Sequence, residues 1–194
     1  MNIPLFPLHT VVLPEGQLRL RLFEPRYLDM LTNCLRDNTG FGVCLIRDGR
    51  EAGGTAEPFE QGTLVSIADW DKGEDGLLHI TAVGEQKFRL LDATRQPDNL
   101  LVGNIECLPA EESCSLPDEH RNLALLLERV FSQMPWNNDL GEPRFEDALW
   151  VGSRLLEILP LPRDERYAIF CSEDALQRVE KLAHYIKSAS ANPN

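Results

Sequence analysis

The chain has 194 residues, of which 43% are hydrophobic and 26% are charged, an ordinary composition for one or two compact globular domains. Its formal net charge of -12 makes nucleic acid an unfavourable partner, because duplex binding needs a clustered positive surface. It lacks an apolar run of the roughly 20 residues that cross a bilayer, lacks a signal-peptide pattern, and has five scattered cysteines without metal-ligand or redox spacing. We therefore expect a cytoplasmic protein with reduced thiols and no membrane contact.

The N-terminal segment begins with an apolar stretch that Pro4 and Pro7 interrupt, which predicts an extended edge strand or first strand. Residues 14–16 (Pro-Glu-Gly) predict a turn in which Gly16 takes the positive φ. The strand expected next has the period-two pattern of a half-buried strand, in which Leu18, Leu20 and Leu22 alternate with Arg19, Arg21 and Phe23. A helix should follow from Pro25 to Arg36, because proline suits the first helical position.

The remainder of the first half predicts further short strands separated by turn residues. They are expected at Gly40–Arg47, Gly62–Trp70, Leu77–Val83, Gln86–Asp92 and Leu101–Leu108. Turn signals about every ten residues favour a closed or nearly closed barrel over a sheet of βαβ units. After residue 117 the apolar residues recur at helical spacing instead. Helices are expected at Asp118–Met134, Phe145–Leu159, Arg163–Phe170 and Glu173–Ser188.

The order of residue types in PLFPL…VLPEGQLRLRLFEPRYLDML resembles the start of the Lon N-terminal domain family. The segments AVGEQKFRL at 82–90 and LWVGSRLLEILPLP at 149–162 resemble two later signatures of that family. The resemblance extends over roughly residues 3–187 and is looser near Arg166-Tyr167 and Ile169-Phe170. It implies an α+β fold, with a PUA-like β pseudobarrel followed by a small C-terminal helical bundle. It also implies protein or peptide binding, as in the substrate-recognition domain of the ATP-dependent Lon proteases.

On this basis we expect a β-rich subdomain at 1–108, a linker at 109–117, a helical subdomain at 118–190 and a frayed tail at 191–194. The residues that carry the resemblance are expected to be mainly structural. They are Pro4, Phe6, Pro7, Pro14, Phe23, Glu24, Arg26, Tyr27, Gly84 and Arg89. Glu24, Arg26 and Tyr27 should close the corner between a strand and a helix, with Glu24 near the free amides of the helix N-terminus. Direct ligand contact by these three residues is the alternative.

Sequence motifs for catalysis are missing. The nearest approach to a phosphate-binding loop, residues 49–55, has threonine where the lysine that reaches the phosphates must be. Ser153 lies on a helix and not on a nucleophile elbow, and the four histidines are dispersed. We therefore expect a non-enzymatic protein without a cofactor or a metal.

Binding is expected instead from aromatic side chains at loop positions, namely Phe59, Trp70 and Trp136. An edge strand of the barrel could also accept an extended chain through main-chain hydrogen bonds. The expected partners are unfolded or apolar polypeptide segments, presented to a separate ATP-dependent protease or chaperone. Two alternatives are a small-ligand sensor, which needs a deep pocket of converging polar groups, and an RNA-binding PUA-like module.

Overall fold

A computed structural model describes residues 1–133 and 141–191 of the chain, with side chains up to residue 189. The chain divides into two compact units, Met1–Pro109 and Ala110–Asn194. Within the described residues, none of the helices combines the length and the apolar character that a bilayer-spanning helix requires.

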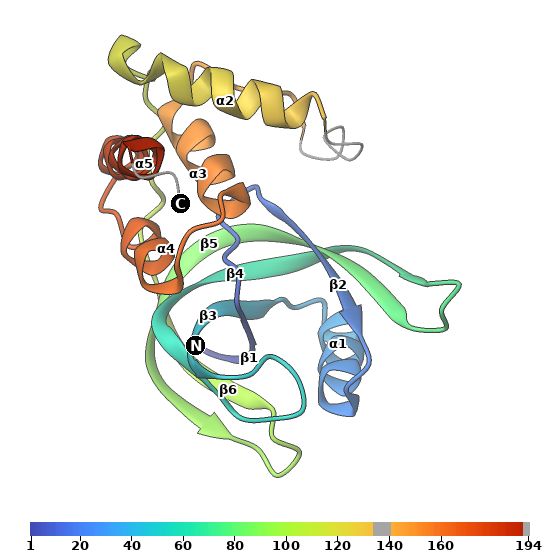
Figure 1. Ribbon diagram of the computed structural model, residues 1–194. Helices are drawn as coiled ribbons and strands as arrows, with labels where there is room; N and C mark the ends of the chain where they lie inside the picture. Colours follow the sequence, from blue (N-terminus) through green and yellow to red (C-terminus); the bar gives the residue numbers. More distant parts are fainter. Residues whose placement is uncertain (134–140, 192–194) are drawn as a thin grey trace. The chain divides into compact units, whose positions relative to one another are not determined.

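The first unit consists of six strands and one helix, coloured from blue to green in Figure 1. In chain order these elements are β1 (Asn2–Leu8), β2 (Gln17–Leu22), α1 (Pro25–Asp37), β3 (Phe41–Gly49), β4 (Ala56–Lys72), β5 (Leu78–Arg95) and β6 (Leu101–Cys107). The strands form one mixed sheet in the order β2-β5-β4-β3-β1-β6, in which β1 runs parallel to β3. With the helices of the second unit, this confirms the α+β fold class.

Strand β5 closes the sheet because it is 18 residues long and pairs with three other strands. Along one edge its first part pairs with β2 and its last part with β6, while β4 pairs along the other edge. The barrel is therefore closed at one end, where β6 joins β1 to β5. At the other end, the ladder between β1 and β6 stops at Leu5, so Phe6–Leu8 pair with β3 alone among the described residues.

Strand β1 lies inside the sheet, between β3 and β6, so it is the first strand but not an edge strand. Its side chains alternate between two cores. Ile3 and Leu5 belong to one apolar cluster with Phe88, whereas Phe6 and Leu8 belong to the other. The interruption by Pro4 and Pro7 does not exclude β1 from the sheet interior, because it still pairs with strands on both sides.

Helix α1 begins with Pro25 and covers the larger of these cores. Its buried apolar residues, Tyr27, Met30, Leu31 and Cys34, recur at helical spacing and form one face. The helix ends at Asn38, which takes the left-handed conformation (φ 52°) that asparagine tolerates better than most residues. The strand–turn–strand–helix order predicted for the N-terminal segment is therefore present.

The expectation of a loop around Phe59 is wrong, because β4 begins at Ala56 and includes it. Pro58 does not break the strand, since it pairs with Ile46 where the register between β3 and β4 shifts, and such irregularities tolerate proline. The two strands expected at 77–83 and 86–92 are one continuous strand, β5. Gly84 and Gln86 pair with consecutive residues of β4, so Glu85 is an extra residue in β5. The strand continues through this bulge instead of ending there.

The turn at residues 14–16 carries its positive φ on Glu15 (φ 65°) and not on Gly16, which corrects the expectation. Gly84 holds this turn by two backbone hydrogen bonds, from the Glu15 amide to the Gly84 carbonyl and from the Gly84 amide to the Gly16 carbonyl, both 2.8 Å. A Cβ on Gly84 would lie 2.1 Å from the Leu13 carbonyl oxygen. The contact therefore requires glycine at residue 84.

The described residues of the second unit form a short 3-10 helix and four α-helices. They are η1 (Asp118–His120), α2 (Arg121–Phe131), α3 (Ala148–Ile158), α4 (Arg163–Phe170) and α5 (Ala175–Ala191). Part of the segment expected as a linker is ordered within this unit, because Ser115 forms a bridge with Asp147, the N-cap residue of α3. Helix α5 includes Ala191, and the other three positions of the expected tail lie outside the described residues.

The interior of the second unit combines aromatic and charged side chains. The rings of Phe131, Phe145 and Trp150 contact one another edge-to-face, with centroids 5.4 to 6.5 Å apart. Arg178 is fully buried and pairs with Glu111 at 2.7 Å. Because a buried charge is costly without a partner, this pair ties the start of the unit to α5.

Candidate functional site

A groove of about 260 Å³ opens in the first unit beside β2. Its lining comes from four places in the chain: the end of β1, strand β2 with the residues after it, the start of α1 and the loop between β3 and β4. The lining residues are Phe6, Leu8, Arg19, Leu20, Arg21, Leu22, Phe23, Glu24, Tyr27, Glu51 and Ala52. The groove therefore lies between β1 and β2. These two strands are joined by the eight residues 9–16 but do not pair with each other.

Strand β2 contributes the consecutive residues Arg19–Leu22 to the groove, and these alternate between apolar and charged side chains. Leu20 and Leu22 pack against the larger core, whereas Arg19 and Arg21 are exposed on the opposite face. Phe23 follows the strand and is 58% exposed, although it is a large apolar residue. An apolar side chain left in water beside an apolar groove is available for contact with a partner.

The floor of the groove is a stack of two aromatic rings at the corner between β2 and α1. The rings of Phe6 and Tyr27 stack with centroids 4.0 Å apart, and the Arg26 guanidinium lies 4.5 Å from the centre of the Tyr27 ring. Burial raises the pKa of the Tyr27 hydroxyl, and the neighbouring Arg26 partly opposes that rise. The raised pKa favours the neutral phenol, which keeps the floor largely apolar.

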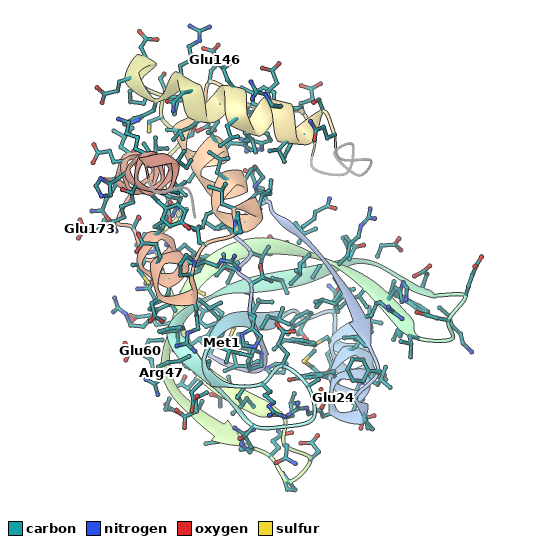
Figure 2. All side chains as sticks on the ribbon, in the orientation of Figure 1. Met1, Glu24, Arg47, Glu60, Glu146 and Glu173 are labelled. Carbon is teal, nitrogen blue, oxygen red and sulfur yellow. The ribbon has the colours of Figure 1, made fainter. Side chains whose placement is uncertain are left out.

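Arg26 fixes this corner through two partners. It pairs with Glu24 at 2.9 Å and donates a hydrogen bond to the Asn99 carbonyl oxygen at 2.9 Å. Glu24, labelled in Figure 2, occupies the N-cap position of α1 but makes no side-chain capping hydrogen bond. Its carboxylate is directed to Arg26 instead of to the free amides of the helix, which corrects the expected role of Glu24.

The loop between β3 and β4 forms the remaining wall. The Glu51 carboxylate accepts a hydrogen bond from the backbone amide of His9, just after β1. Gly49 (φ 103°) and Gly53 (φ 68°) adopt backbone conformations that favour glycine. The loop is thus attached to the chain just after β1 by the hydrogen bond between the His9 amide and the Glu51 carboxylate.

The groove follows an edge of the sheet. In the part of the chain that the structure describes, β5 is the one strand that pairs with β2. The groove therefore has an apolar floor and runs beside an edge strand.

A neighbouring hollow of about 360 Å³ lies on the other side of Glu24 and is more polar. Its lining includes Asp29, Asp98 and Asn99 together with the Gly53–Thr55 part of the loop. The two hollows share Glu24, so the ion pair with Arg26 marks the boundary between them.

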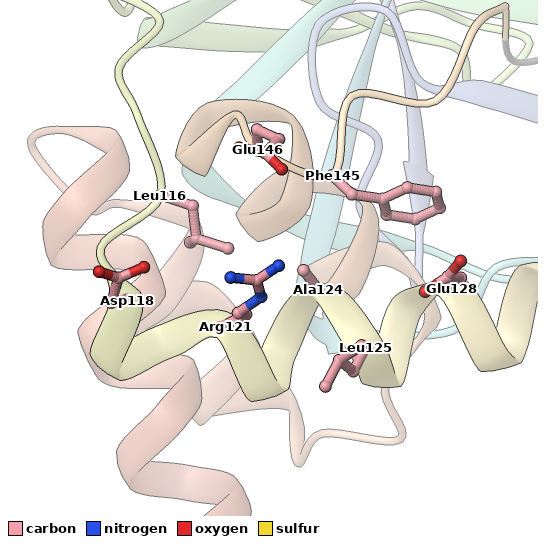
Figure 3. A pocket seen from close by; sticks show the side chains of 8 residues that line it. All are labelled: Leu116, Asp118, Arg121, Ala124, Leu125, Glu128, Phe145 and Glu146. Atoms are coloured by element: carbon pink, nitrogen blue, oxygen red, sulfur yellow. The ribbon is translucent and has the colours of Figure 1, made fainter.

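The second unit has a pocket of its own, of about 220 Å³, shown in Figure 3. Arg121 points into it from α2, near Leu116 and below Glu146. Asp118 and Glu128 add two further carboxylates to the lining. One guanidinium among three carboxylates gives this pocket a mixed, mainly acidic character.

Two of the three aromatic residues that the sequence analysis favoured, Phe59 and Trp70, lie outside the groove. Trp70 is 54% exposed in β4, opposite Ile80 of β5 and close to the turn that joins these strands. Phe59 is partly buried within β4. Trp136 lies outside the described residues. Of the three, Trp70 alone is shown as a large exposed apolar side chain.

The residues behind the family resemblance divide into different local roles. Phe6, Phe23, Glu24 and Tyr27 line the groove. Elsewhere, Gly84 supports the turn at Pro14, and Arg89 is an exposed residue 3.8 Å from Glu106.

Sequence reasoning missed Leu8, Glu51 and Ala52 as groove residues. They lie far from β2 in sequence, and no local pattern distinguishes them. The alternation in β2 followed by Phe23 was the available signal, because it left one aromatic residue on the polar side of a strand.

Comparison with protein families shows that the model of the ATP-dependent protease La (LON) substrate-binding domain matches residues 2–188. Among solved structures, a Lon N-terminal domain protein from Xanthomonas campestris is 36% identical, with a TM-score of 0.78 over 95% of this chain and 98% of that one. The N-terminal domain of a Mycobacterium avium complex Lon protease has the same fold, with a TM-score of 0.65 at 15% identity over 95% of this chain and 97% of that one.

Among curated proteins, the chain is similar to cereblon from two vertebrates. It is 32% identical to the Danio rerio protein over 56% of this chain and 26% of that protein. It is 25% identical to the Xenopus tropicalis protein over 94% of this chain and 41% of that protein. The chain therefore spans less than half the length of these relatives.

Proposed function

We propose, from the premise that this chain belongs to the LON substrate-binding domain family, that its groove between β1 and β2 binds extended segments of unfolded polypeptide. One observation carries the proposal: Phe23 is 58% exposed next to a groove floored by Phe6 and Tyr27. Exposed aromatic residues beside a preformed apolar surface are the usual anchors of polypeptide binding.

The lining favours a polypeptide over the alternatives. A small polar ligand needs converging polar groups in a deep pocket, whereas most of the residues that line this groove are apolar. An RNA ligand needs a basic surface, and the chain carries 31 acidic against 19 basic side chains. Extended segments of unfolded proteins offer the apolar side chains that such a groove can bury.

We further propose that the protein acts without catalysis, as an adaptor that presents damaged or unfolded clients to a separate ATP-dependent protease or chaperone. The family supports a substrate-recognition role, and the matched region is its substrate-binding domain. A cytoplasmic location belongs to the same proposal. The five free cysteines are compatible with a reducing compartment.

The test compares binding of a fluorescent, permanently unfolded protein, made by reduction and alkylation, to the full chain and to the variant Phe23→Ser. Because Phe23 is exposed, the variant should fold normally while its affinity falls about tenfold, which corresponds to ~1.4 kcal/mol. Fluorescence anisotropy measures the affinity, and chemical denaturation checks the fold.

The matched control is Leu91→Ser. Leu91 is 56% exposed in β5 of the same unit and lies outside the groove. We expect its affinity to equal that of the unchanged protein. Equal weakening by both substitutions would mean that the groove has no special role, and unchanged affinity of Phe23→Ser would contradict the proposed site.

A further inference from the structure

We infer that the exposed face of α2, together with the pocket beside it, docks a basic amphipathic helix of a partner protein. The exposed face of α2 is defined by Arg121, Leu125 and Glu128. This inference goes beyond the proposed function, because it assigns a second binding surface, in the unit that does not contain the groove. An adaptor needs two such surfaces to join a client to another protein.

The spacing of residues along α2 separates a buried face from the exposed one. The buried residues of the helix are Leu123, Ala124, Leu127 and Phe131. Arg121 and Leu125 are four residues apart and Glu128 follows three residues later, so their side chains share one side of the helix. All three are exposed, and Leu125 is 55% exposed although it is a large apolar residue. The exposed face therefore has an apolar centre between two charged residues.

The pocket beside this face has a wall that the fold holds in place. The chain opposite α2 is held by a bridge between Ser115 and Asp147 and by a hydrogen bond of 2.8 Å from the Leu116 amide to the Glu146 carbonyl oxygen. The Phe145 ring on this wall belongs to the aromatic cluster of the second unit. Because the pocket is preformed, docking requires little ordering of this chain.

The pocket offers a place where an apolar side chain of a partner can be buried. Leu125 lines it together with Leu116, Ala124 and Phe145 (Figure 3). A single exposed leucine is ordinary on a protein surface, but this one lies beside other apolar side chains. The volume of about 220 Å³ is below the roughly 300 Å³ at which small-molecule pockets begin. It suits one inserted side chain of a partner protein better than a whole small ligand.

Charge complementarity gives the sign of the partner. The pocket places Arg121 among the carboxylates of Asp118, Glu128 and Glu146. Within the described residues, none of these four side chains forms an ion pair or a side-chain hydrogen bond. Their charges are therefore available to a partner, and the surplus of carboxylates favours basic side chains.

A helix is the form of partner that fits this surface. Arg121, Leu125 and Glu128 extend over about two turns of α2, and a second helix can pack along them with an apolar residue opposite Leu125. Nucleic acid has the wrong charge for this pocket. A second copy of the chain would bring carboxylates against carboxylates. The occupant is therefore a helix of another protein that carries basic residues on both sides of an apolar one.

The test titrates a fluorescently labelled, alanine-based helical peptide into the full chain. The peptide has a leucine with one lysine four residues before it and another three residues after it, so that all three lie on one face. A second peptide has glutamate in place of both lysines. Fluorescence anisotropy should show roughly tenfold tighter binding of the lysine peptide. Equal affinities of the two peptides would overturn the inference.

Leu125→Ser tests where the peptide binds. Because Leu125 is exposed, the variant should fold normally, while its affinity for the lysine peptide falls about fivefold. The matched control is Leu176→Ser, at a leucine that is 40% exposed in α5 of the same unit and lies outside the pocket. Its affinity should equal that of the unchanged protein. Unchanged affinity of Leu125→Ser would overturn docking on α2.

Glu128→Gln tests the charge of the same face. Loss of this carboxylate should weaken binding of the lysine peptide about threefold. The control Glu180→Gln makes the same change in net charge at an exposed position of α5, outside the pocket, and should alter the affinity by less than about 1.5-fold. Equal effects of the two substitutions would show that net charge alone matters and would overturn recognition by α2.

The same titrations separate this surface from the groove. Phe23→Ser, and saturation of the unchanged protein with the unfolded protein, should leave the affinity for the lysine peptide as it was. Displacement of the peptide by the unfolded protein would show that the peptide is bound as a client and would overturn the inference. Failure of the lysine peptide to bind would also overturn it, whereas the proposed function stands or falls separately on the effect of Phe23→Ser on binding of the unfolded protein.

Discussion

The groove of the first unit and the pocket of the second unit have similar volumes, about 260 and 220 Å³, but differ in what surrounds them. The groove has a stacked aromatic floor and lies along β2, which is at one end of the strand order of the sheet. The pocket lies beside α2, and Arg121 shares it with three carboxylates. Most main-chain groups of α2 are paired within the helix, so this helix contributes to the pocket mainly through its side chains.

This difference matters because a client-binding protein must accept many sequences. Main-chain groups are the same in every polypeptide, and an apolar floor accepts many side chains. A pocket of alternating charges instead discriminates between particular ligands. The comparison therefore favours the β unit as the place of the proposed polypeptide binding.

The largest expected effect comes from removing the floor of the groove with Tyr27→Ala. Tyr27 is 5% exposed and stacks on Phe6, so its loss should lower the free energy of unfolding by about 4 kcal/mol. Tyr27→Phe keeps the ring and should cost about 1 kcal/mol or less. Urea denaturation of the full chain measures both, and a small loss in the alanine variant would show that the floor is not part of the core.

Tyr27 should also make the free energy of unfolding depend on pH in the alkaline range. Burial raises the pKa of its hydroxyl above the ordinary value, so its contribution to stability is complete below about pH 10. That contribution is lost as the pH rises through the raised pKa of the folded state. The Tyr27→Phe variant should lack this part of the pH dependence.

A somewhat smaller effect is expected from Gly84→Ala, which acts on the turn before β2. The added Cβ would lie 2.1 Å from the Leu13 carbonyl oxygen, and backbone must move to relieve it. We expect a loss of about 3 kcal/mol in the free energy of unfolding. The control Gly54→Ala, whose nearest contact would be 3.8 Å, should change stability by less than about 0.5 kcal/mol.

The helical unit can be perturbed independently with Glu111→Gln. This substitution leaves the fully buried Arg178 without its carboxylate partner. We expect a loss of about 2 kcal/mol in stability, below the usual figure for a buried pair because Glu111 keeps some exposure. Polypeptide affinity, measured where the variant remains folded, should be unchanged, and a loss of affinity would contradict the assignment of binding to the β unit.

The smallest effect concerns the turn between β4 and β5. The pKa of Asp75 is lowered, first by the hydrogen bond from the Leu77 amide and then by His79 and Arg21. Its stabilising contribution is therefore present above about pH 4 and is lost as the pH falls through the lowered pKa. NMR titration should show a low pKa for this carboxyl in the unchanged protein and a value nearer the ordinary one in Arg21→Gln.

Local patterns predicted the elements that build the groove. The alternation from Leu18 to Phe23 predicted β2 and its two faces, and Pro25 predicted the start of α1. These predictions succeed because each depends on neighbours in sequence. The α+β class followed from the change of periodicity after residue 117 and from the family resemblance.

Features that depend on strand pairing were not predictable in this way. Pro58 suggested a loop, yet an irregular register with β3 accommodates it within β4. The first part of β5 pairs with β2 and its last part with β6, and this change of partner places β2 at the end of the strand order. No local sequence pattern indicates it. The groove itself depends on that arrangement, so Leu8 and Glu51 could not be assigned to it from sequence.

The most direct test of the account is backbone hydrogen–deuterium exchange of the full chain, with and without a saturating unfolded protein. The account predicts slower exchange in Arg19–Glu24 when the client is bound, because these residues line the groove that the client would cover. Exchange in α2 should not change. Protection in α2 with none in β2 would contradict the assignment of client binding to the groove.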